Sequence, residues 1–134
     1  MRTPKIALLA VLMMIAATPV VAHHSFAMFD RSRQVSISGT VKAFQYTNPH
    51  SWVIVTVPGA NGQDVDWGFE SEGPSTLLRA GIKHSSLNPG EKVTAIAYPM
   101  RDGRPAGSLI SITKADGAVL TFRAGPPPAD NPVK

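Results

Sequence analysis

The chain of 134 residues contains no cysteine. It therefore has no disulfide framework, no thiolate nucleophile and no zinc-thiolate site. It also lacks a glycine-rich phosphate loop and the nucleophile-elbow sequence of serine hydrolases. Glu70 and Glu72 are close in sequence, but acidic residues at this spacing more often form a solvated edge than an acid-base pair. We therefore expect a protein that is not an enzyme.

The sequence also has only a small excess of positive over negative charge. The sequence has 13 basic and 9 acidic residues, a formal net charge of +4. Two of the basic residues, Arg2 and Lys5, precede the first apolar run, and without them 11 minus 9 leaves +2. The remaining basic residues are scattered and form no stripe that would follow a phosphate backbone. We expect no nucleic-acid partner.

Residues 1–22 have the composition of a secretory signal peptide. Arg2 and Lys5 give a positive start, residues 6–17 are uncharged and apolar, and Pro19 precedes a small-residue cleavage site at Ala22. A membrane-spanning helix needs about 20 apolar residues, and this run is shorter. We predict cleavage after Ala22, a mature chain that begins at His23, a periplasmic or secreted location, and no membrane span after cleavage.

Strand patterns dominate the mature chain. Alternating apolar and polar residues at 35–44 and 64–70 indicate half-buried strands, and residues 51–57 are apolar on both faces. In the segment 64–70 we expect Val65, Trp67 and Phe69 to face inward. Gly39 predicts a bulge or bend. Further strands are predicted at 91–98, 108–114 and 118–122, the last two joined as a hairpin by Asp116-Gly117.

One helix is predicted, over residues 74–81, between the third and fourth strands. Three strands, a helix, two strands and a hairpin arm are the element order of an all-β, OB-fold-like five-stranded barrel. A small β-sandwich is the alternative, but it would need about seven strands and would not explain the helix. We assign the barrel to residues 23–123. The proline-rich residues 124–134 are expected to be extended or disordered.

An OB-fold barrel binds ligands on the face of strands two and three, between the loops that join strands one to two and four to five. The first of these loops carries His50 with Asn48 and Pro49, and the second carries Arg101, Asp102 and Arg104. The alternative for the two strand tryptophans is core packing, because large aromatic side chains are mostly buried. The residues that we select for a binding site are Trp52, Trp67, Glu70, Arg101 and Asp102.

Two adjacent histidines open the predicted mature chain. Cleavage would leave the α-amine and imidazole of His23 on one residue, and His24 would add a third nitrogen donor. A nitrogen-rich set without thiolates suits copper(II), nickel or zinc, and His50 or, less readily, His84 would complete it. Alternatively, the two histidines lie loose on the surface. The apolar residues that follow, Phe26, Met28 and Phe29, would hold the terminus against the barrel.

The motifs HHSFAMFD, GTVKAFQYTNPHSW, DWGFE, LLRAG, NPGEKV and PMRDGRPAG together resemble those of a family of small exported bacterial proteins of unknown function. The resemblance spans His23 to about Phe122. It implies a signal peptide and a periplasmic OB-type barrel, but no activity. His84 lies outside the motifs. The motif positions are occupied by His23, His24, Asn48, His50, Trp52, Glu70, Arg101, Asp102 and Gly103.

The sequence thus predicts an exported binding module that uses His23, His24 and His50 to hold a divalent transition metal, copper first. Glu70 or Asp102 would orient a ligand histidine. The alternative is a cell-envelope accessory module that binds a partner protein or an oligosaccharide through strand edges and Trp52 or Trp67, without a metal.

Overall fold

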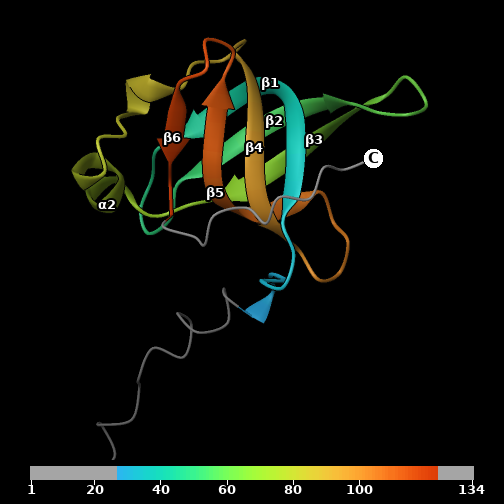
Figure 1. Cartoon of the computed structure of the whole chain (residues 1–134), viewed down its shortest axis with the longest axis horizontal. Helices are drawn as coiled ribbons and strands as arrows, with labels where there is room; N and C mark the ends of the chain where they lie inside the picture. Colours follow the sequence, from blue (N-terminus) through green and yellow to red (C-terminus); the bar gives the residue numbers. More distant parts are fainter. Residues whose placement is uncertain (1–26, 124–134) are drawn as a thin grey trace, which may run out of the picture.

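The computed structural model describes residues 27–123 (Figure 1). Within this range strands are the main secondary structure, and the predicted element order is confirmed. The elements are β1 (Val35–Gln45), β2 (Trp52–Pro58), β3 (Asp64–Glu70), α2 (Pro74–Arg79), the 3-10 helix η1 (His84–Ser86), β4 (Lys92–Pro99), β5 (Ala106–Lys114) and β6 (Val119–Thr121).

Five of the strands close into a barrel. β1 pairs with β4 along its first half and with β2 along its second half, and both pairings are antiparallel. β2 pairs with β3, and β4 with β5, also antiparallel. The ring is closed by a parallel pairing between β3 and β5, while β6 pairs with β5 outside the ring. This confirms the all-β, OB-fold-like barrel with one short α-helix between the third and fourth strands and a terminal hairpin arm.

β1 bends where it passes from β4 to β2. The register shift lies between Val41 and Ala43, and not at Gly39 as predicted. The extra residue turns Phe44 toward the core, with 6% of its surface exposed, where strict alternation would have placed Ala43. Gly39 has a different role: a Cβ atom there would lie 2.4 Å from the carbonyl oxygen of Thr56. Glycine is therefore needed for the close approach of β1 and β2.

The core fills the barrel, and one end of it is closed by α2. Leu77 of α2 is fully buried, and the Tyr46 hydroxyl donates to the carbonyl oxygens of Ile82, at 2.9 Å, and Pro74, at 3.1 Å. These contacts stabilise a helix of six residues, which is too short to be stable alone. The residues that are 0% exposed and apolar in this core are Val53, Val55, Phe69, Leu77, Ala95, Ala97, Leu109 and Ile112.

The prediction that Val65 faces the core was wrong. Its side chain is 40% exposed, whereas Phe69 of the same strand is fully buried. The hairpin between β2 and β3 extends beyond the body of the barrel (Figure 1). The beginning of β3 therefore lies outside the region where alternation separates a core face from a solvent face.

A second apolar cluster lies outside the ring and is covered by the first described residues. Tyr98 and Ile110 follow the core residues Ala97 and Leu109, so their side chains point to the outer face. Phe29 packs on them and is 4% exposed. Of the three apolar residues predicted to hold the terminus, Phe29 packs against the barrel, Met28 is 43% exposed, and Phe26, like His23 itself, lies outside the described residues.

The described part of the chain, residues 27–123, contains no helix with the length and apolar character needed to cross a membrane. The predicted signal peptide at 1–22 and the proline-rich segment at 124–134 lie outside these residues.

Candidate functional site

One row of paired residues crosses four strands on the outer face of the barrel. Trp52 of β2 pairs with Glu70 of β3, Glu70 pairs with Ser108 of β5, and Ser108 pairs with Tyr98 of β4. Directly paired residues place their side chains on the same face of a sheet. Because Phe69, the neighbour of Glu70, is buried in the core, this row faces outward. We call these four residues the outer row.

A histidine and a carboxylate form a close pair at the outer row. The Nδ1 atom of His50, at the end of the β1–β2 loop, lies 2.6 Å from Oε1 of Glu70. The Glu70 side chain is 11% exposed, whereas the His50 side chain is 42% exposed. When Nδ1–H donates to Glu70, the other ring nitrogen, Nε2, keeps a lone pair that can bind a cation or accept a proton.

Backbone hydrogen bonds of the neighbouring residue hold His50 in this position. Its neighbour Ser51, which is fully buried, donates its N–H to the Glu72 carbonyl oxygen at 3.2 Å and accepts at its own carbonyl oxygen from the Ser71 N–H at 2.9 Å. The loop also passes close to Gly73, where a Cβ atom would lie 2.7 Å from the Pro49 carbonyl oxygen. The β1–β2 loop is thus bound to the residues that follow β3, and Glu70 ends that strand.

The two tryptophans have different surroundings. Trp52 is half-buried in the outer row, beside Glu70, and its ring lies over Gly68, where a Cβ atom would be 3.8 Å away. Trp67 stacks on Phe69, with 5.9 Å between the ring centroids, and packs against the core. The structure therefore brings Trp52 to the histidine-carboxylate pair and directs Trp67 to the core cluster.

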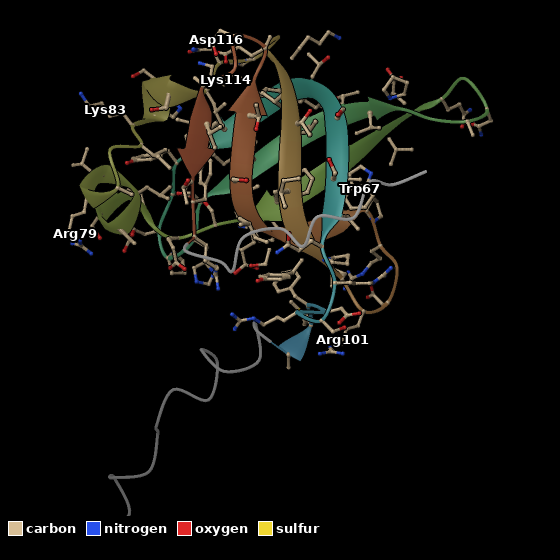
Figure 2. The ribbon with its side chains drawn as sticks, in the orientation of Figure 1. Trp67, Arg79, Lys83, Arg101, Lys114 and Asp116 are labelled. Atoms are coloured by element: carbon tan, nitrogen blue, oxygen red, sulfur yellow. The ribbon has the colours of Figure 1, made fainter. Side chains whose placement is uncertain are left out.

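Arg101, in the β4–β5 loop, binds the segment that precedes β1. Its guanidinium Nε donates to the Ala27 carbonyl oxygen at 3.1 Å, and its backbone N–H donates to the Met28 carbonyl oxygen at 2.9 Å. A bridge between Phe29 and Met100 continues this pairing. Arg101 therefore attaches the start of the described chain to the barrel, at the end shown with its label in Figure 2.

Asp102 is engaged within its own loop. It accepts from the Arg104 backbone N–H at 3.1 Å and from the Arg104 Nε at 2.7 Å. The backbone hydrogen bond, followed by the guanidinium, lowers the pKa of the Asp102 carboxyl. The structure thus pairs Asp102 with an arginine and assigns the carboxylate partner of His50 to Glu70.

The predicted metal ligands His23 and His24 lie outside the described residues. Among residues 27–123, no three histidine, aspartate or glutamate side chains form a group that could hold a metal ion. His84 packs near Phe44 and Tyr46, with ring centroids 6.2 and 6.1 Å apart, and not in the outer row.

The sequence reasoning did not find Ser108 or Tyr98 as members of the site. Both residues are 4% exposed, and Ser108, which pairs with Tyr98, also pairs with Glu70 of a strand far away in sequence. Only the parallel pairing of β3 with β5 places Ser108 beside Glu70 and Tyr98 one strand further, and no local sequence pattern predicts that register.

Comparison with known proteins assigns the chain to a family. The family described as "Family of unknown function (DUF6152)" matches residues 10–109. No curated protein and no solved structure matches the chain.

Proposed function

The chain belongs to this family of unknown function, and because that description supplies no activity, we propose a function from the site itself. The protein is an exported, non-enzymatic binding module of the periplasm. It holds a divalent transition metal, copper first, between its mature N-terminus and His50.

The pair formed by His50 and Glu70 is the observation that supports this proposal. Histidines that bind metals commonly donate their second ring N–H to a carboxylate, which fixes the ring and raises its basicity. The separation of 2.6 Å between Nδ1 and Oε1 has this form. Glu70 is mostly covered while the imidazole is partly exposed, so the pair offers one oriented nitrogen to a cation from solvent.

The N-terminal segment approaches the same face. Phe29 packs on Tyr98, and Tyr98 is two strands away from Glu70 in the outer row. Neighbouring strands are about 4.8 Å apart, so the two residues are separated by roughly 10 Å. His23 precedes Phe29 by six residues, which can span at most roughly 20 Å. Covalent reach therefore permits His23 to meet His50.

The proposed ligands are the α-amine and imidazole of His23, the imidazole of His24 and Nε2 of His50. Amine and imidazole nitrogens are donors that copper(II) prefers, and the chain has no thiolate that would favour copper(I) or zinc. Glu70 is the positioning residue for His50.

Isothermal titration of copper(II) into protein that begins at His23 tests the proposal. We expect His23→Ala to weaken copper binding at least tenfold, because it removes an imidazole, and Glu70→Gln to weaken it by about tenfold through the loss of the orienting carboxylate. His84→Ala is the matched control, since His84 is exposed and lies away from the outer row. It should leave the affinity unchanged.

Unchanged affinity in the variant that combines His23→Ala with His50→Ala would disprove the proposal. If the unmodified protein binds no copper and carries no metal when purified from the periplasm, the accessory-module alternative gains support. In that case Trp52, half-buried beside Glu70, is the first residue to test for contact with a partner protein or an oligosaccharide.

A further inference from the structure

A groove of about 400 Å³ lies at the other end of the barrel from Arg101. It is formed where β5 ends and β4 begins, whereas the outer row crosses β5 near its start. Lys114, which borders it, and Arg101 are labelled at opposite ends of the molecule in Figure 2. We call it the hydroxyl groove, and its polar lining consists of Ser38, Thr40, Lys92, Thr94, Thr113 and Lys114.

Three of the hydroxyl residues form a row across three strands. Ser38 of β1 pairs with Thr94 of β4, and Thr94 pairs with Thr113 of β5. Val93 and Ile112, which precede the two threonines, are buried in the core, so the hydroxyls point to the outer face. Ser38 Oγ and Thr94 Oγ1 are 2.8 Å apart. One hydrogen lies between these two oxygens, and each hydroxyl can accept further hydrogen bonds.

Lys92 supplies a positive charge at the edge of this row. Its ammonium donates to Thr40 Oγ1 at 2.7 Å, which uses one of its three N–H donors. The ammonium of Lys114 lies 2.9 Å from Glu91 Oε2, so its charge is balanced by that carboxylate. No ion pair of Lys92 occurs among the described residues, and none of the described residues that line the groove is acidic.

We propose that the hydroxyl groove binds a small sugar that carries a negative charge. Lys92 would bind its carboxylate or phosphate, and Ser38, Thr94 and Thr113 would exchange hydrogen bonds with its hydroxyl groups. A positive charge by itself would bind any small anion, and a row of hydroxyl groups by itself would bind any sugar. A groove that offers both therefore favours a sugar that carries a negative charge. The volume is within the range of small-molecule sites. This site does not depend on the metal proposal, because it shares no residue with the outer row or the N-terminal segment.

Amide chemical shifts followed by NMR during ligand titration test this assignment. The probes are glucuronate and glucose 6-phosphate, with glucose and inorganic phosphate as the single-feature controls. Because the groove is open to solvent, we expect dissociation constants of about 1 mM for the two acidic sugars. The shifts should map to residues 38–40, 92–94 and 113–114, and each control should bind at least about tenfold more weakly.

Two substitutions separate the charge from the hydroxyls. Lys92→Met keeps the apolar stem and removes the ammonium, and we expect it to weaken glucuronate binding about tenfold. Thr94→Val removes one hydroxyl with little change in shape and should weaken binding severalfold. Lys83→Met, at an exposed lysine that does not line the groove, is the control and should have no effect. An unchanged melting temperature shows that each variant folds.

Three results would overturn the proposal. They are shifts that map elsewhere or do not occur, glucuronate binding that persists in Lys92→Met, and glucose or phosphate that binds as tightly as the acidic sugars.

Discussion

The two ends of the barrel are built in different ways. At one end, His50, Arg101 and the segment around Phe29 are held by loop hydrogen bonds and by apolar packing outside the ring. At the other end, the polar groups of the hydroxyl groove stand on regularly paired strands. Chemistry at the first end therefore depends on long-range closure of the fold. At the second end the polar groups stand on directly paired strands, so each side chain can be changed without altering a loop.

Removal of Phe29 should have the largest effect. The side chain is 4% exposed and covers Tyr98, Met100 and Ile110. We expect Phe29→Ala to lower the free energy of unfolding by about 3 kcal/mol, because it leaves a cavity in the outer cluster. Urea denaturation measures the loss. Met28→Ala, at a side chain that is 43% exposed, should change stability by less than about 0.5 kcal/mol.

Equal losses in these two variants would mean that the N-terminal segment is not packed as an integral part of the fold. The distinction between a loop-built end and a strand-built end would then disappear.

A methyl group at Gly39 should have the next largest effect, at the end that carries the groove. The new Cβ atom would lie 2.4 Å from the Thr56 carbonyl oxygen, so β1 and β2 must move apart. We expect Gly39→Ala to destabilise the protein by about 2 kcal/mol in urea denaturation. Gly68→Ala is the matched control, because its nearest contact would be an ordinary 3.8 Å to Trp52. A cost as large for Gly68→Ala would contradict this interpretation.

Loss of the Arg101 side chain should have a smaller effect, on copper binding. Arg101→Ala removes the hydrogen bond to the Ala27 carbonyl oxygen but keeps the backbone hydrogen bond to Met28. If the arginine brings the terminus to His50, copper affinity in isothermal titration should fall by about threefold to tenfold. Arg104→Ala, which disrupts only a pair within the same loop, serves as the control.

The double variant identifies the mechanism. In protein that already carries His50→Ala, the Arg101→Ala effect should vanish, because there is no longer a distant ligand to approach. An equal effect in both backgrounds would show that Arg101 does not act through His50.

The smallest effect concerns pH and lies beside the hydroxyl groove. Hydrogen bonds from Asn88, and then from Lys114, lower the pKa of Glu91. A carboxyl with a lowered pKa in the folded state stabilises the protein above its unfolded pKa of about 4.3, and this contribution is lost as pH falls through the folded value. In Glu91→Gln, the decline of melting temperature below that pH should be shallower. The difference in stability should stay under about 1 kcal/mol near neutral pH. Parallel profiles would contradict the ionic role.

Strand positions could be predicted to within one or two residues, because alternation and turn chemistry are local. The helix begins at Pro74 as predicted. After Val41, the residues of β1 that face the core could not be predicted. The register shift turns Phe44 inward, whereas strict alternation predicts Ala43 at that position. Of the candidate site residues within the described chain, His50, Glu70 and Trp52 do come together. Asp102 does not orient a histidine. It accepts hydrogen bonds from Arg104, which lies two positions away in the same turn.

The amino-acid sequence by itself determined the strands, the short helix and the element order of a barrel, because each of these depends on neighbours along the chain. Tertiary structure alone decided that Glu70 pairs with Ser108, that Phe29 covers the outer face, and that the hydroxyls of Ser38, Thr94 and Thr113 form one row. These contacts arise when strands far apart in sequence pair in one register, and the free energy that fixes this register comes from burying the whole core at once.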